Sequence, residues 1–127
     1  MADLPRPTPA ELAILRVLWE RGSATVREIH EALSPGAPAG YTTVLKLLQI
    51  MTEKRLVERD ESRRAHVYRP AVAAERTQRQ LVGDLVDRAF AGSTARLVQQ
   101  ALSARHPDAG ELAEIRRLLD SLEGEDR

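Results

Sequence analysis

The chain has 127 residues, of which 43% are hydrophobic, 30% charged and 3% aromatic, with no cysteine and a formal net charge of zero at pH 7. This length fits one domain or two small ones, and the composition indicates a folded chain with aliphatic cores. A chain without cysteine has no disulfides, thiolate metal sites or cysteine nucleophile. No apolar run approaches the roughly 18 residues that span a bilayer, and the N-terminus does not resemble a signal peptide. We therefore expect a cytoplasmic protein without membrane insertion.

Charge is unevenly distributed along the chain. Residues 1–70 carry eleven Lys and Arg against nine Asp and Glu, whereas residues 71–127 carry eight against ten. Within residues 41–70 the count is seven against four. A local positive field can serve DNA binding even when the whole chain is neutral.

The first two expected helices begin with the same capping pattern. Thr8-Pro9-Ala10-Glu11 places a cap, a first-turn proline and a reciprocal carboxylate at the start of a helix that ends near Gly22. Residues 23–25 are expected to form a short extended link. Thr25 and Glu28 then repeat the capping spacing at the start of a second helix, which ends before the turn at Ser34–Pro38.

A third helix is expected over residues 41–54, with Gly40 as its cap. Its apolar positions recur at helical spacing: Val44, Leu47, Leu48 and Met51. The opposite face has no carboxylate until Glu53 and carries four polar or basic residues: Thr42, Thr43, Lys46 and Gln49. An ordinary amphipathic helix remains the alternative for this segment taken alone, but such a face also suits the DNA major groove.

Beyond residue 54 the hydrophobic period changes from 3.6 to 2. Residues 56–59 and 66–69 are expected to be short strands joined by a charged tip at residues 60–64. Three helices followed by a β-hairpin predict a winged helix-turn-helix. The candidate DNA-binding residues are Tyr41, Thr42, Thr43, Lys46, Gln49, Arg63 and Arg64. The alternative role of Thr42 is that of a capping or solvated threonine, and that of Arg63 and Arg64 is a solvated surface charge. For Lys46, a contact with a phosphate is favoured over a contact with a base.

Helical periodicity returns after residue 70 and predicts three more helices. The first covers residues 74–90, the second begins at residue 93 or 94, and the third begins at residue 108 or 110. Three helices in about 50 residues bury too little surface to be stable alone, and a second copy of the chain is the simplest partner. The fold class is thus mainly α with a small β-hairpin wing. We expect a DNA-binding domain at residues 1–70 and a dimerisation domain at residues 71–127. The candidate dimerisation residues are Leu81, Leu85, Leu97, Val98, Leu112, Ile115, Leu118 and Leu119.

Catalysis and metal binding find no support in the sequence. His30, His66 and His106 are scattered and form no HExxH pattern, and neither a nucleophile motif nor a Gly-rich phosphate loop is present. We expect no enzyme activity, no cofactor and no metal site.

The segments ELAILRVLWERGSATVREIHEAL, YTTVLKLLQIMTEKRLVERDES and RAHVYRP resemble the penicillinase-repressor (BlaI/MecI) family. The resemblance covers residues 8–70 and the order of the C-terminal helices. It implies a dimeric transcriptional repressor that binds palindromic operators in double-stranded DNA. It also implies a membrane sensor metalloprotease as a partner, whose activation leads to cleavage or release of the repressor.

Two departures from the family limit what the resemblance implies. Well-known members are cut at an Asn-Phe bond, and the corresponding pair here, the candidate cleavage site, is Gln100-Ala101. The different side chains argue against cleavage of the same specificity. Copper-responsive relatives carry a cysteine motif, which this chain lacks. Two other functions stay open: a winged helix that binds protein, and a one-component regulator that binds a small ligand between its two halves.

Overall fold

The computed structural model describes residues 5–33 and 40–125 of the chain. Contacts divide the chain into two compact units, the first ending at Val82 and the second beginning at Gly83. The turn expected at Ser34–Pro38 lies outside the described residues. The expected domains, residues 1–70 and 71–127, stay a prediction.

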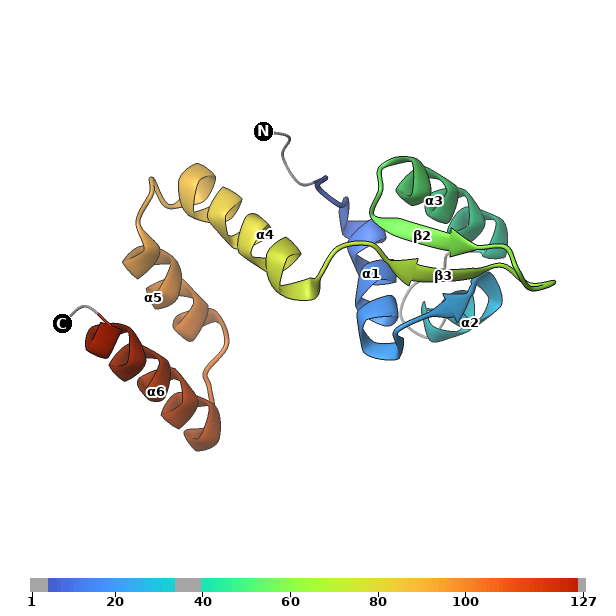
Figure 1. The fold of residues 1–127 in the computed structure, drawn as a ribbon. Coiled ribbons are helices and arrows are strands. Elements are labelled where there is room, and N and C mark those ends of the chain that lie inside the picture. Colours follow the sequence, from blue (N-terminus) through green and yellow to red (C-terminus); the bar gives the residue numbers. More distant parts are fainter. Residues whose placement is uncertain (1–4, 34–39, 126–127) are drawn as a thin grey trace. The chain divides into compact units, whose positions relative to one another are not determined.

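The first unit contains three helices and a three-stranded antiparallel sheet (Figure 1). In chain order these elements are α1 (Pro9–Arg21), β1 (Ala24–Thr25), α2 (Val26–Leu33), α3 (Tyr41–Glu53), β2 (Val57–Asp60) and β3 (Val67–Pro70). β3 is the central strand, with Tyr68 opposite Ala24 on β1 and opposite Arg59 on β2. This is the expected winged helix-turn-helix, and β2 and β3 form the wing.

The sheet differs from the prediction in two respects. Residues 24 and 25 pair with β3 instead of forming an unpaired link, and a two-residue strand is too short to show a period in sequence. Both wing strands begin one residue later than expected. Leu56 precedes β2 because its N–H binds the carbonyl of Met51 at 2.9 Å, which closes the turn at the end of α3.

Both predicted capping boxes are present and have the same geometry. In each, the threonine N–H donates to the glutamate Oε1 at 2.8 Å, and the glutamate N–H donates to the threonine Oγ1 at 3.2 Å. The pairs are Thr8 with Glu11 and Thr25 with Glu28. Gly22 ends α1 with a φ of 86°, a left-handed conformation that glycine adopts without steric cost.

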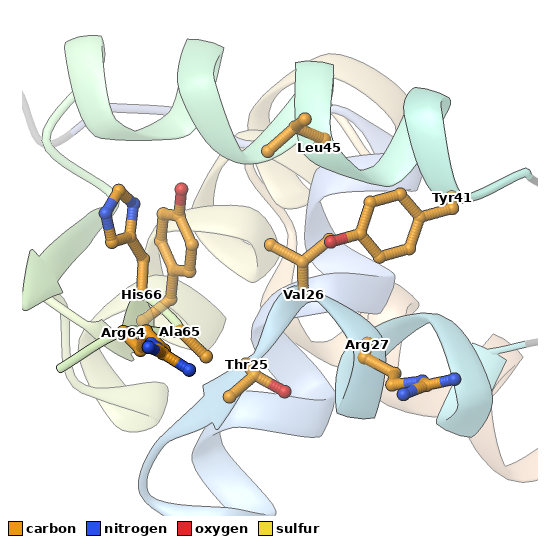
Figure 2. Close-up of a pocket in the computed structure, with 9 residues that line it drawn as sticks. Thr25, Val26, Arg27, Tyr41, Leu45, Arg64, Ala65 and His66 are labelled. Carbon is orange, nitrogen blue, oxygen red and sulfur yellow. The ribbon is translucent and has the colours of Figure 1, made fainter. Parts of the chain in front are cut away.

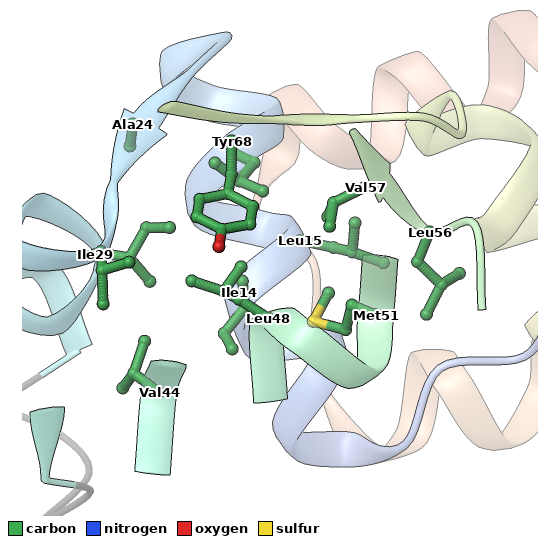
Figure 3. Packing of buried hydrophobic residues seen from close by; sticks show 12 residues of the cluster. Ile14, Leu15, Ala24, Ile29, Val44, Leu48, Met51, Leu56, Val57 and Tyr68 are labelled. Carbon is green, nitrogen blue, oxygen red and sulfur yellow. The ribbon is translucent and has the colours of Figure 1, made fainter. Parts of the chain in front are cut away.

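The core of the first unit is formed by side chains from the three helices and the sheet (Figure 3). Ile14 and Leu18 of α1, Ile29 of α2 and Leu48 of α3 are fully buried, and Tyr68 of β3 is 1% exposed. Tyr68 fills the space between the sheet and the helices. This packing fixes α3 against the other two helices and the wing.

Trp19 is half-buried at the edge of the core. Its indole Nε1 donates a hydrogen bond to the carbonyl of Val72 at 2.9 Å. The bond ties α1 to the segment that leaves β3, 53 residues further along the chain.

The C-terminal part of the chain forms α4 (Ala74–Ala89), α5 (Thr94–Ala104) and α6 (Ala109–Glu125). Ser93 caps α5 by accepting from the N–H of Arg96 at 3.1 Å, and Asp108 accepts from the N–H of Glu111 at 2.8 Å at the start of α6. Neither α5 nor α6 has a buried side chain. Among the helices of residues 5–33 and 40–125, none combines the length and the apolarity that a membrane crossing requires.

An ion pair joins the beginning of α1 to the end of α3. Lys54 Nζ lies 2.6 Å from Glu11 Oε1 and also donates to the carbonyl of Arg6 at 3.1 Å. The Glu11 side chain is 3% exposed and that of Lys54 is 32% exposed. Burial alone would raise the pKa of Glu11, but the bonds and charge from Lys54 and the bonds from Thr8 outweigh it and hold the pKa below its ordinary value.

Replacing Lys54 with methionine should lower the free energy of unfolding at pH 7 by about 1–2 kcal/mol, because a buried carboxylate loses its charged partner. The Glu11 pKa is depressed in the folded state, so the stability it supplies is present above the unfolded pKa and is lost as pH falls through the folded pKa. In the variant the bond and charge from Lys54 no longer lower the pKa of Glu11, so protonation costs the variant less stability than it costs the wild type. Urea titrations should therefore show the difference between wild type and Lys54→Met shrinking as pH falls from 7 to about 3.

The second capping box supplies the control for this prediction. Glu28 has the same cap geometry but is exposed and has no lysine partner. Glu11→Gln should lower stability at pH 7 more than Glu28→Gln does, since glutamine can close a capping box in both places. Equal losses from the two substitutions would show that the ion pair contributes nothing.

Candidate nucleic-acid interface

The exposed face of α3 carries short polar groups and one cation. Its buried face consists of Val44, Leu48 and Met51, each 0% exposed, and Leu47 is half-buried. The four residues predicted for the opposite face are all exposed: Thr42, Thr43, Lys46 and Gln49. Tyr41 begins the helix and is 49% exposed. The helix faces are therefore as the sequence predicted.

Carboxylates on the wing strands are engaged by arginines of the wing. Arg69 on β3 donates to Glu58 Oε2 on β2 at 3.0 Å from Nη2 and 3.1 Å from Nε. Arg59 pairs with Glu61. These pairs neutralise Glu58 and Glu61, two acidic groups of the wing that would repel a phosphate backbone.

The tip of the wing leaves two arginines exposed. Asp60 Oδ1 accepts from the N–H of Ser62 at 2.9 Å, and the hydrogen bonds from Ser62 lower the pKa of Asp60. Arg63 and Arg64 follow, both exposed. No carboxylate in the described part of the chain forms an ion pair with either one. The charge of Arg63 contributes to the lowered pKa of Asp60, so Arg64 is the guanidinium group more available to an anionic partner.

A cavity of about 410 Å³ brings together candidate residues that are distant in sequence (Figure 2). It is lined by Tyr41 at the start of α3 and by Arg64 from the wing. Arg63 lines a different, smaller cavity of about 150 Å³. The candidates Thr42, Thr43, Lys46 and Gln49 line neither. The two adjacent arginines therefore face different surroundings.

Sequence reasoning missed the part of this cavity that α2 contributes. Arg27, from the first turn of α2, and Thr25, at the end of β1 directly before α2, line it together with His66 from the wing. Thr25 was recognised only as a cap, and Arg27 lies 37 residues from the wing arginine across the same cavity. Arg27 is exposed in the structure. In the sequence, its positive charge in the first turn of the expected second helix was the only feature that pointed to a role in this cavity.

Helices α4 to α6 expose large apolar side chains in the single chain. Four of the candidate dimerisation residues are exposed: Leu85 at 48%, Val98 at 41%, Leu118 at 63% and Leu119 at 55%. The other four are half-buried: Leu81, Leu97, Leu112 and Ile115. Val82 at 47% and Leu122 at 59% were not among the candidates. Such exposure of leucine and valine marks an association surface or a binding face.

The candidate cleavage bond and the three histidines lie on different parts of the chain. Gln100 and Ala101 are exposed residues within α5. His30 lies edge-on to Tyr41, with ring centroids 6.2 Å apart, whereas His66 and His106 are exposed. Within residues 5–33 and 40–125, no group of three His, Asp or Glu side chains is placed to hold a metal ion.

Residues 7–121 match the family described as penicillinase repressor. Transcriptional regulator BlaI of Mycobacterium tuberculosis, in two strains, is 44% identical over 71 residues, which make up 55% of this chain and 51% of BlaI. The chain thus spans about half the length of the curated relatives it matches.

Solved structures with a similar fold include several regulators. The DNA-binding domain of the repressor BlaI is 24% identical with a TM-score of 0.51, over 58% of this chain and 90% of that domain. Monomeric Bacillus licheniformis BlaI in complex with the blaP half-operator is 24% identical with a TM-score of 0.51, over 59% of this chain and 92% of that one. Mutant MarR of Escherichia coli complexed with operator DNA is 19% identical with a TM-score of 0.52, over 91% and 75% of the two chains. The likeness of these structures supports the winged-helix fold, and the sequence match over residues 7–121 shows that this chain belongs to the penicillinase repressor family.

Proposed function

We propose that the protein is a homodimeric transcriptional repressor that binds a palindromic DNA operator and is released by a signal from a membrane sensor protease. The observation that carries this proposal is the exposed face of α3, which offers hydroxyl, amide and ammonium groups with no carboxylate before Glu53. Membership of the penicillinase repressor family supports it.

In the proposed complex α3 lies in the major groove with its first turn nearest the base edges. Thr43 can bond a base or contact a thymine methyl, and Gln49 can pair with adenine. Lys46 contacts a phosphate. The wing arginines, Arg63 and Arg64, contact phosphates or the neighbouring minor groove. The ion pairs of the wing strands support this, since they leave the cations at the tip in excess.

Dimerisation through the C-terminal helices is supported by the leucines of α6. Leu118, Leu119 and Leu122 are each more than half exposed in the single chain. A second copy that covers these side chains would remove their apolar surface from water, which is the main favourable term in protein association. A symmetric dimer would present two copies of α3 to half-sites roughly 10 bp apart, or a multiple of that distance.

Release by a sensor protease concerns the candidate cleavage bond in α5. The Gln100–Ala101 bond lies inside α5, and both residues are exposed. A protease that binds its substrate in an extended conformation would have to unwind α5 around this bond. The proposed event is release of the repressor by a signal, which cleavage at this bond would produce.

A salt titration tests DNA binding together with its physical basis. Selection of bound fragments from genomic DNA should enrich one inverted repeat. On that repeat the slope of log affinity against log salt should be steeper than about −4, because several phosphate contacts per dimer release counterions. Genomic DNA without the repeat is the control for specificity. A flat titration, or selection that enriches no repeat, would contradict the proposed function.

A further inference from the structure

The cavity between α2, α3 and the wing lies wholly within the first unit. Figure 2 shows Arg64 and His66 of the wing on one side and Tyr41 and Arg27 on the other, with Val26 between them. The volume of about 410 Å³ falls in the range of small-molecule sites, roughly 300–1,000 Å³. The wing and α3, which are proposed to bind DNA, therefore also line a cavity large enough for a small ligand.

The inner surface of the cavity is apolar and aromatic. Tyr41 is 49% exposed and Leu45 is half-buried, and these two side chains offer apolar surface to the cavity, whereas Val26 at 7% and Tyr68 at 1% exposed belong to the core behind it. The Tyr41 ring lies at the mouth with its hydroxyl directed toward Val26. Aliphatic and aromatic walls of this kind favour a flat, apolar ligand body.

The polar lining of the cavity is positively charged. Arg27 and Arg64 line it together with Thr25 and His66, and no Asp or Glu is among the lining residues. Arg27 is 3.7 Å from Glu31 on α2, with both side chains more than two-thirds exposed. An exposed pair of this kind contributes little, so the Arg27 guanidinium can turn to another anion at low cost. Two guanidinium groups favour a carboxylate, which each can bind in bidentate fashion.

We propose that this cavity binds a small organic anion that carries a carboxylate on a flat aromatic body of one or two rings. The apolar side chains at the cavity distinguish this ligand from a DNA phosphate, which would use the arginines but leave the exposed parts of Tyr41 and Leu45 in contact with water. The consequence for regulation rests on the proposed function: Tyr41 and Arg64 are proposed DNA contacts, so the bound anion competes with the operator.

The test is a titration of 2-naphthoate into the full-length chain without DNA, followed by amide NMR shifts and calorimetry. Saturable shifts are expected at Val26, Leu45 and His66. Arg64→Gln should weaken binding about tenfold. Arg63→Gln is the matched control, since Arg63 does not line this cavity, and it should change the dissociation constant by less than about twofold. With the wild-type chain, neutral 2-naphthamide should bind about tenfold more weakly than 2-naphthoate.

Three results would overturn the proposal. The first is the absence of saturation by 2-naphthoate, and the second is an equal loss of binding in the two arginine variants. The third is that inorganic phosphate shifts the same amide resonances with a dissociation constant as low as that of 2-naphthoate. This result would show that the cavity binds a DNA phosphate. Because the titration contains no DNA, its failure leaves the repressor proposal standing. A chain that binds 2-naphthoate but selects no genomic repeat would refute the repressor proposal and the competition with the operator, and would leave the anion site standing.

Discussion

Replacing Leu118 with aspartate is expected to turn the proposed dimer into a monomer and to lower operator affinity by about 100-fold. Leu118 is 63% exposed in the single chain and lies beside the exposed Leu119 and Leu122. In the proposed dimer this side chain is covered, and burying a carboxylate there without a partner costs several kcal/mol. A monomer binds one half-site and loses the gain from two linked sites, which amounts to about 10²–10⁴ in affinity. Sedimentation velocity and operator titration measure the two effects.

Arg117→Asp is the matched control on the same helix. Arg117 is exposed on the polar side of α6, and its substitution changes the net charge more than Leu118→Asp does. It should leave the dimer intact. The fluorescence of Trp19, the one tryptophan, reports on unfolding of the first unit and should be unchanged in both variants. If Leu118→Asp remains a dimer, dimerisation through α6 is wrong.

Features set by residues close together in the chain could be predicted from the sequence. A capping box depends on two residues three positions apart, and both boxes formed as expected, at Thr8 and at Thr25. The period of two located the wing to within one residue. The buried face of α3 followed from its period of 3.6, apart from Leu47, which is half-buried.

Features that depend on residues brought together by folding could not be predicted. Glu11 was recognised as a cap, but its ion pair with Lys54 joins residues 43 positions apart. Arg27 of α2 and Arg64 of the wing likewise line one cavity, although they are 37 positions apart in the chain. Periodicity identifies which side of an element is buried, but it does not identify which element covers that side. The interface predicted from sequence therefore included α3 and the wing and omitted α2.

Thr43→Ala and Lys46→Ala should weaken operator binding in different ways. If Thr43 contacts a base, its loss should cost about 1–3 kcal/mol at one base pair and relax the preference there. If Lys46 contacts a phosphate, its loss should weaken binding about equally for all sequences and make the salt slope shallower by about 1. Both side chains are exposed on α3, so the free energy of unfolding should change by less than about 0.5 kcal/mol. Titrations against the operator and against single-base variants at several salt concentrations separate the two effects.

Arg16→Ala on α1 is the control for Lys46→Ala, because it removes the same charge from an exposed helical position outside the proposed interface. If only the total charge of the chain matters, both substitutions should lower affinity equally at low salt, and the salt slope should not distinguish them. If α3 lies in the groove, the slope should change for Lys46→Ala alone, since counterions are released only where a cation meets a phosphate. An equal response from α1 and α3 would mean that the polar face of α3 is an ordinary solvated surface.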